Sequence, residues 1–134
     1  MRIKCRMISK GFAEGEALVS PEPISFFGGI DPKTSVVIDK KHPLKGVCIK
    51  DKILIFPTGK GSTVGSYVIY QLKLNKVAPK GIICKEADPV VAVGAIIAGI
   101  PMVDKPEKFD FKTGQYVRIN ADEEYIEVVE KSKS

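Results

Sequence analysis

The sequence predicts an α/β protein, and three observations lead to that fold class. Its 134 residues, 44% of them hydrophobic, suit one packed core, so residues 1–134 are expected to form a single domain. Residues 52–103 alternate apolar strand-like runs with stretches of helical periodicity. Strand-like patterns separated by turn residues stand on both sides of that segment. The chain therefore predicts a βαβαβ unit flanked by further strands.

The N-terminal part of the chain predicts strands and one long loop. Residues 2–9, "RIKCRMIS", alternate apolar and polar residues, which places Ile3, Cys5 and Met7 on one face of a strand. A second strand, "GEALVS", follows a turn from Gly11 to Gly15. Residues 21–39 hold three prolines and a glycine pair, and a loop of that length is more often functional or covered by a partner than idle. The segments "GVCI" and "KILIF" predict two more strands.

Two helices are expected after these strands. Val64, Val68 and Leu72 recur every fourth residue, which predicts a helix that begins at Thr63 and ends near Asn75. The buried strand "GIIC" follows. The second helix, "VVAVGAIIA", has an Asp-Pro pair before it and a glycine after it, which are typical start and stop signals. The strand "IPMV" completes the unit, whose strands should pair in parallel through right-handed crossovers.

The end of the chain predicts a hairpin and a tail. "QYVRIN" and "EYIEVV" are two strands separated by a short polar turn. Residues 130–134, "EKSKS", are expected to fray.

Composition argues against several classes of partner. The formal net charge is +5, but only three basic residues are arginine, and the basic residues are not interleaved with aromatics. No nucleic-acid partner is therefore expected, and the lysines are interpreted as a solvated surface. The longest apolar run, residues 89–103, is broken by glycine and proline and falls short of the about 20 residues that span a bilayer. With no signal-peptide core at its start, the chain is expected to be a soluble, cytoplasmic protein without a membrane partner.

The cysteines give no pattern for a metal. Cys5, Cys48 and Cys84 are far apart, odd in number and without a C-x-x-C pair, so neither a disulfide framework nor a metal or iron–sulfur site is expected in this chain. They are expected to be reduced thiols, most of them buried.

The segment "TGKGSTVGS" predicts an anion site. Gly59 and Gly61 allow the backbone to approach a ligand closely, and Ser62 is the expected N-cap of the following helix. Free N–H groups and the positive end of the helix dipole would meet there and attract a carboxylate or phosphate. Gly61 occupies the position that needs Ser or Thr in a Walker loop, and the glycine spacing differs from the dinucleotide fingerprint. A tight turn with a capping serine and no ligand is the alternative.

A complete catalytic set is absent from the sequence. His42 is the only histidine, and its neighbourhood in a polar, proline-containing turn favours a surface residue over a base that activates a serine. The chain alone thus offers an anion site with one hydroxyl, and a partner must supply the rest.

Three segments carry a family resemblance: "GEALVSPEPISFFGGIDP", "FPTGKGSTVGSYVIYQL" and "APKGIICKEADPVVAVGAIIAGIPMV". They resemble the small subunit of the aconitase X family, a swivelling β/β/α domain. The resemblance implies a barrel-like mixed sheet with flanking helices, and a hydro-lyase that is active only with its large subunit, as a heterodimer. Archaeal members dehydrate 5-phosphomevalonate in the modified mevalonate pathway of isoprenoid biosynthesis, whereas relatives elsewhere dehydrate hydroxyprolines. The implied substrate is a small phosphorylated hydroxy acid, with hydroxyproline as the alternative.

The resemblance also implies roles for individual residues. The large subunit would carry a [4Fe-4S] cluster whose open iron assists departure of the hydroxyl group, and Ser62 would accept the proton. Gly59, Gly61 and Thr63 would shape the loop. Lys60 would contact the carboxylate or phosphate of the substrate, unless it is merely an exposed lysine.

A second loop belongs to the same implied site. Gly28 and Gly29, in "FGGIDP", would line the cleft or the subunit interface, with a plain Asp-Pro turn as the rival interpretation. The family pattern has glycine where this chain has Ser35, and serine where it has Thr63. The arginine that follows the serines of ordinary aconitases is missing, so citrate is a poor candidate substrate.

Two other functions compete with the dehydratase. "VVAVGAIIAGIPMV" is also similar to the helix of phosphohistidine carrier domains, but Val90 stands near the position that needs the histidine, which argues against a carrier. A non-catalytic phosphate-binding module is compatible with the anion site and the positive charge.

Overall fold

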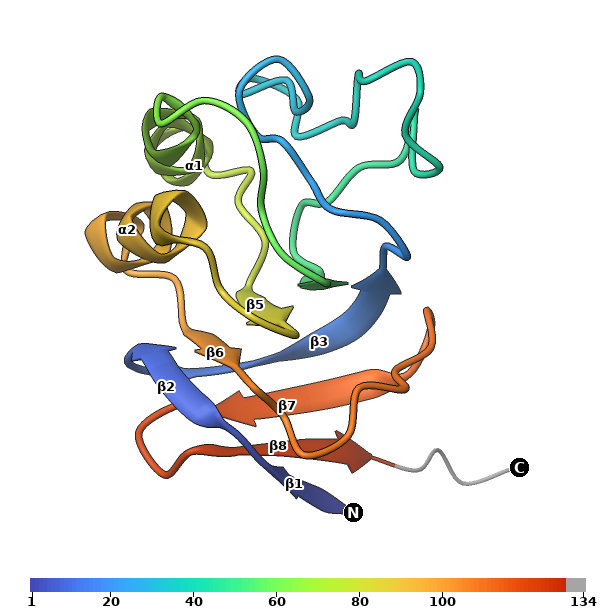
Figure 1. Ribbon diagram of the computed structural model, residues 1–134, viewed down its shortest axis with the longest axis vertical. Helices are drawn as coiled ribbons and strands as arrows, with labels where there is room; N and C mark the ends of the chain where they lie inside the picture. The colour runs from blue at the N-terminus through green and yellow to red at the C-terminus, as the bar shows by residue number, and fades with distance from the viewer. Residues whose placement is uncertain (130–134) are drawn as a thin grey trace.

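Three parallel strands form the middle of the fold, and two helices cover one of their faces. In the computed structural model, β4 (Ile53–Phe56), β5 (Gly81–Cys84) and β6 (Met102–Asp104) pair in parallel, and every residue in them is buried. α1 (Gly65–Leu74) joins β4 to β5, and α2 (Pro89–Ala98) joins β5 to β6. Figure 1 shows the two helices on the same side of these strands. The predicted βαβαβ unit is confirmed.

The remaining strands extend the sheet with mainly antiparallel pairs. β3 (Phe12–Val19) pairs in parallel with β4 and antiparallel with β7 (Tyr116–Asn120), which forms a hairpin with β8 (Tyr125–Val129). β1 (Arg2–Lys4) pairs with β8, and β2 (Arg6–Ser9) pairs with β6. The result is one eight-stranded mixed sheet in the order β1-β8-β7-β3-β4-β5-β6-β2. The predicted C-terminal hairpin is confirmed.

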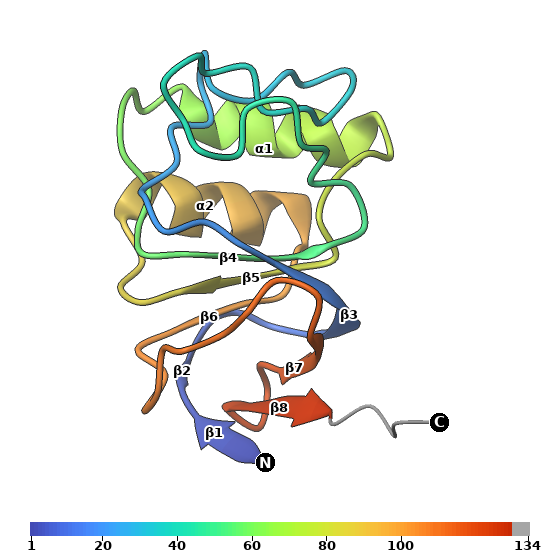
Figure 2. The same cartoon turned by 90° about the vertical axis from the view of Figure 1, so that its right-hand side faces the viewer.

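The two edges of this sheet are held together by the chain itself. β1 and β2 lie at opposite ends of the strand order, yet only Cys5 separates them in the sequence. Since one residue spans less than about 4 Å, the sheet has to curl until its edges are neighbours. Figure 2 shows the antiparallel strands below the parallel ones. The predicted barrel-like mixed sheet with flanking helices is confirmed.

Alternation along the strands divides the core into two clusters. Ile53 and Ile55 point into the curled sheet, where they pack with residues such as Val117 from the antiparallel strands. Leu54 and Phe56 point the other way, into the cluster beneath the helices. Both faces of the parallel strands are thus covered, which explains their continuous apolar sequences.

The long segment between β3 and β4 contributes to the helix-side core. It forms no strand, but Ile24, Phe26, Ile30, Val37 and Ile49 are all buried in that cluster. The predicted strand "GVCI" is wrong, because only an isolated bridge joins its cysteine to residue 36. The loop is therefore a packed layer beside α1.

Other details differ from the sequence-based predictions. Residues 2–9 form two strands, and Met7 is exposed, because the chain changes partner strand at Cys5. The turn predicted before "GEALVS" is already strand, since β3 begins at Phe12. Cys84 is buried, Cys5 is half-buried and Cys48 is exposed, so most thiols are not buried.

The structure describes residues 1–129, so the fraying predicted for 130–134 lies outside the described residues. Within 1–129, none of the helices has both the length and the apolar character needed to cross a bilayer.

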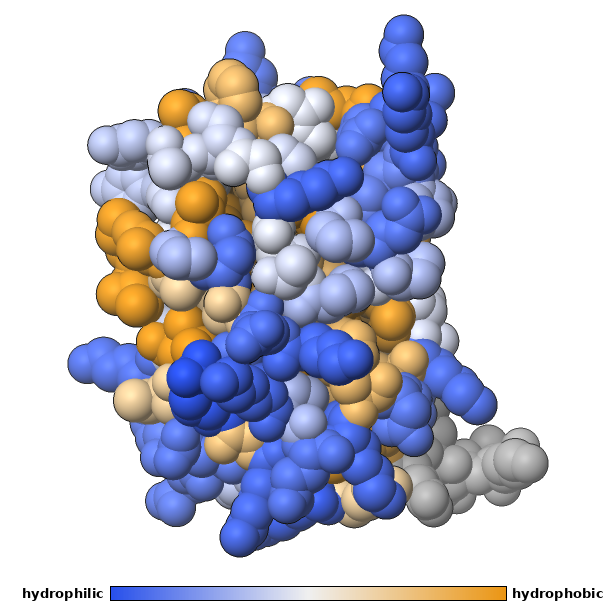
Figure 3. Space-filling view, viewed as in Figure 1, coloured by the Kyte–Doolittle hydropathy of each residue, from blue (hydrophilic) through white to orange (hydrophobic). Residues whose placement is uncertain are grey.

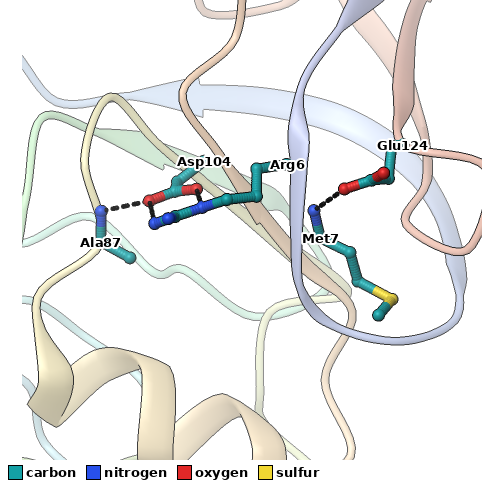
Figure 4. A network of polar contacts seen from close by, with 5 residues as sticks. All are labelled: Arg6, Met7, Ala87, Asp104 and Glu124. Atoms are coloured by element: carbon teal, nitrogen blue, oxygen red, sulfur yellow. Dashed lines mark hydrogen bonds and ion pairs between the residues drawn. The ribbon is translucent and has the colours of Figure 1, made fainter.

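Hydrogen bonds secure the sheet edge where β2 meets β6 (Figure 4). The Arg6 guanidinium donates from Nε and Nη2 to the two carboxylate oxygens of Asp104, each at 2.8 Å. The Ala87 N–H donates to the same carboxylate at 2.9 Å. Asp104 is fully buried, and a buried carboxylate is stable only with such partners. Asp104 therefore ties β6 to β2 and to the turn that leads into α2.

Ser35 occupies a position better suited to glycine. Its φ of 67° is left-handed, its side chain is fully buried, and its Oγ has no hydrogen-bond partner among the described residues. Its backbone is held on both sides, because its N–H donates to Asp31 and its carbonyl accepts from Ile49. The conformation is imposed by these contacts although serine disfavours it.

We expect Ser35→Gly to stabilise the protein by about 1 kcal/mol, because it removes the left-handed strain and the unpaired hydroxyl at some cost in chain entropy. Urea unfolding of the isolated chain measures this change. Ser35→Ala is the matched control, since it removes the hydroxyl and keeps the strain, and it should gain less. A lower unfolding free energy for Ser35→Gly would contradict the interpretation.

Candidate functional site

Ser62 lies on an exposed loop between β4 and α1. Its Oγ accepts a hydrogen bond from the Val64 N–H at 3.2 Å, and its carbonyl oxygen accepts one from the Gly65 N–H at 3.0 Å. α1 begins at Gly65 with Val64 at the N-cap position, so the predicted start at Thr63 and the predicted N-cap at Ser62 are wrong by two residues. A tight turn precedes the first α-helical residue here, as is common at helix ends. Ser62 still caps that turn through its side chain.

The loop presents backbone donors to solvent. The N–H groups of Gly61, Ser62 and Thr63 find no acceptor among residues 1–129. They stand at the N-terminal end of α1, where no side chain caps the helix itself. Unpaired N–H groups and a helix N-terminus together favour an anion. The loop therefore has the donors that an anion site requires, and the site itself stays a prediction.

The α2 N-terminus holds the loop in place from one side. The Asp88 carboxylate accepts hydrogen bonds from the N–H groups of Val90 and Val91, which confirms the predicted N-cap. A Cβ built on Gly59 would overlap Asp88 Oδ1 and come within 2.5 Å of Val91 Cγ2. Gly59 is thus needed for close packing against α2, whereas the sequence suggested backbone freedom for ligand approach.

The loop that contains Gly28 and Gly29 lies against the loop that contains Gly59 and Gly61. Gly61 has a φ of 92°, and a Cβ built there would overlap the Ser25 hydroxyl. A Cβ on Gly65 would lie 3.7 Å from the Phe27 N–H nitrogen. The two loops are therefore neighbours at the start of α1, although more than 30 residues separate them in the sequence.

Gly28 and Gly29 shape this second loop for different reasons. Gly28 has a φ of 79° and open space where a Cβ would lie, while a Cβ on Gly29 would overlap the Ser25 carbonyl oxygen. Their part in lining a cleft or an interface stays a prediction.

Lys60 has a fixed backbone and an exposed side chain. Its N–H donates to the Ile24 carbonyl at 3.0 Å, and no ion pair of its ammonium occurs within residues 1–129. The amine can therefore meet an anion at the loop without breaking a contact.

His42 is buried, so the predicted surface position is wrong. Its Nδ1 accepts a hydrogen bond from the Leu44 N–H, and its Nε2 lies 3.2 Å from Ser20 Oγ. With Nδ1 as acceptor, a neutral ring carries its proton on Nε2 and donates to Ser20. His42 thus anchors its turn and does not act as a base toward that serine.

The donor groups of residues 1–129 do not suit a metal cluster. Within residues 1–129, His, Cys, Asp and Glu side chains form no group of three that could hold a metal ion. Burial, with nearby Glu124 and Asp104, raises the pKa of Cys5 to about 12. Burial also raises the pKa of Cys84 well above its usual range. Such thiols resist becoming the thiolates that iron–sulfur ligation requires.

Sequence reasoning missed the residues that support the site. Ser25 and Asp88 touch the glycine loop from distant parts of the chain, and Asp88 was recognised only as a helix cap. A cluster of lysines was missed as well. Lys10, Lys73, Lys76 and Lys80 surround a shallow pocket at the C-terminal end of α1, opposite to Ser62.

We expect Gly59→Ala to lower the unfolding free energy by about 2 kcal/mol, because the added methyl group pushes the loop away from Asp88 and Val91. Thermal or urea unfolding measures the change. Lys60→Ala is the control at the next, exposed position, and it should change stability by less than about 0.5 kcal/mol. Equal stabilities of the two variants would mean that Gly59 is not held against α2.

Comparison with known proteins gives a consistent result over nearly the whole chain. The family model of the aconitase X swivel domain matches residues 2–128. The phosphomevalonate dehydratase small subunit of Methanosarcina acetivorans is 54% identical over 137 aligned positions, which cover 100% of this chain and 95% of that protein. The protein of the same name from Thermococcus sibiricus is 55% identical, covering 97% of this chain and 100% of the relative.

A solved structure agrees with these relatives. The crystal structure of holo aconitase X from Thermococcus kodakaraensis has a chain that superposes with a TM-score of 0.94 at 53% identity, covering 97% of this chain and 99% of that chain. Sequence and structure lead to one conclusion: this chain belongs to the aconitase X swivel domain family.

Proposed function

We propose that this chain is the small subunit of a phosphomevalonate dehydratase. This hydro-lyase would remove water from (R)-5-phosphomevalonate and give trans-anhydromevalonate 5-phosphate, a step in isoprenoid formation. The curated relatives of that name support the proposal, because they match over nearly the full length of both chains. The structural observation that carries it is the Ser62 hydroxyl, exposed at the N-terminus of α1 with a backbone donor on its oxygen.

Ser62 is the proton acceptor in this proposal. To accept the proton from the carbon next to the carboxylate, Ser62 has to be an alkoxide before the transfer, and it becomes a neutral hydroxyl when the proton arrives. Its oxygen therefore has to carry negative charge before the step. The Val64 N–H already donates to that oxygen, and the positive end of the α1 dipole lies beside it. Both interactions favour the alkoxide over the neutral hydroxyl, as in other sites that stabilise a developing oxyanion.

Substrate binding would use the neighbouring donors. The N–H groups of Gly61 and Thr63 have no acceptor within residues 1–129 and belong to exposed residues, and Lys60 adds a positive charge. Carboxylate and phosphate are both suitable ligands for such donors. Because Gly28 and Gly29 have no side chains, their loop would leave room for the substrate to reach Ser62.

The iron–sulfur cluster belongs to the large subunit in this proposal. Family membership implies an iron–sulfur enzyme, and the relatives' name implies a larger partner. The cysteines described above do not fit a cluster, so this chain contributes proton transfer and substrate binding. Ser62 is exposed because its site is completed by the large subunit.

We expect Ser62→Ala to lower kcat by about 10²- to 10⁴-fold, the range typical of losing a positioned proton acceptor. The measurement is dehydration of 5-phosphomevalonate by the anaerobically assembled two-subunit enzyme. Ser62→Asn is the matched control, because its side-chain oxygen can still accept from the Val64 N–H but cannot act as the base. Ser62→Asn should be more stable than Ser62→Ala but equally inactive.

Three outcomes would contradict this assignment. Undiminished turnover by Ser62→Ala in an intact complex would reduce Ser62 to a capping residue. Turnover of hydroxyproline in place of 5-phosphomevalonate by the wild-type enzyme would identify the alternative dehydratase. A complex that turns over neither compound would favour a phosphate-binding module.

We expect Lys60→Ala to raise KM for 5-phosphomevalonate about tenfold or more with a smaller effect on kcat, because it removes one charge-assisted contact. Steady-state kinetics of the assembled enzyme measures the two constants. Lys112→Ala, an exposed lysine before β7, is the control and should leave both unchanged. An unchanged KM for Lys60→Ala would show that this lysine only faces solvent.

A further inference from the structure

The outer sides of α1 and α2 together form an exposed apolar surface. Six large hydrophobic residues on them are exposed by 38–69%, and we call this set the two-helix surface: Tyr67, Tyr70, Leu74, Val93, Ile96 and Ile97. The two helices are in direct contact, since the Ser66 hydroxyl donates to the Val90 carbonyl at 2.7 Å. A Cβ on Gly94 would lie 2.7 Å from Ile69 Cδ1. The exposed residues therefore share one continuous face of the helix layer.

α2 has the composition of a helix that is covered on every side. Its ten residues, "PVVAVGAIIA", include no polar side chain, and only the side toward the sheet and α1 is buried. A helix that is apolar all round is normally buried. Hydrophobic residues gather over α2 at the left edge of Figure 3.

Charged residues are scarce on the same surface. Lys73 is the only charged residue of α1, and α2 has none, although 28% of the whole chain is charged. Depletion of charge, together with exposed tyrosine, is typical of the buried core of a protein–protein interface.

We propose that the two-helix surface is the docking surface for the large subunit. The inference rests on the proposed function, in which this chain works with a larger partner. The helices of the surface start beside the loop that the partner has to meet. α1 begins three residues after Ser62, and α2 begins at Pro89, directly after the Asp88 cap that lies against Gly59. A partner that covers the surface also reaches the loop. An apolar face of the large subunit would fit the two-helix surface.

The test measures binding, so that it does not depend on turnover. The affinity-tagged large subunit is immobilised under anaerobic conditions, and the Kd of the small subunit is measured for wild type, Tyr67→Glu and Ile97→Glu. Each substitution should weaken binding by about 30-fold or more, because it buries a charge in an apolar interface. Circular dichroism and Tm of the isolated variants should match wild type, since both residues are exposed in the isolated chain.

Two controls separate docking from general effects and from catalysis. Phe12→Glu changes an apolar residue on β3 that is as exposed as Ile97, at 55% each, and it should alter Kd by no more than about twofold. Ser62→Ala should bind like wild type whether or not it is active, so failure of the proposed function would be seen separately.

Either of two results would overturn the inference. One is unchanged binding by both helix variants. The other is a wild-type small subunit that dimerises in sedimentation experiments, with Tyr67→Glu and Ile97→Glu abolishing the dimer and leaving the Kd for the large subunit unchanged. That result would assign the surface to a second copy of this chain.

Discussion

The single residue between β1 and β2 is the constraint on which the architecture depends. Cys5 joins the two edge strands of an eight-stranded sheet, so the sheet has to close on itself. The Cys5 N–H donates to the Glu124 carbonyl and the Met7 N–H to the Glu124 carboxylate, which holds both edges to one turn. Closure creates an interior lined by one face of every parallel strand. The helices cover the other face, and both of their N-termini lie at the same end of the sheet because the strands that they connect run parallel.

In that arrangement the N-termini of α1 and α2 have different roles. The α2 N-terminus is occupied by its own Asp88 carboxylate, while the α1 N-terminus is open apart from the Ser62 hydroxyl. The capped helix serves as a support, because Gly59 packs against it and the loop cannot drift. The open helix is the one that can stabilise a charge on substrate or on Ser62. A supported loop beside an unoccupied dipole is the structural basis of the proposed proton transfer.

The chain has the properties of one half of an active site. Ser62, the proposed proton acceptor, is exposed, the cysteines are unsuited to a cluster, and an apolar helix layer adjoins the loop. These three features have a common explanation if a larger subunit covers the helices and supplies the remaining chemistry. The lysine-lined pocket lies at the opposite end of α1 and plays no part in this explanation.

Local sequence signals determined the βαβαβ unit, the second helix with its Asp88 and Gly99 ends, and the C-terminal hairpin, because each follows from short-range periodicity or capping. The glycines and the serine of the glycine loop indicated an anion site by themselves, whereas the family resemblance implied the role of Ser62 and the barrel-like sheet. Only the tertiary structure decided the rest. The break at Cys5, the burial of His42 and the packing of Gly59 on Asp88 all depend on contacts between segments far apart in the chain, and no local pattern encodes such contacts.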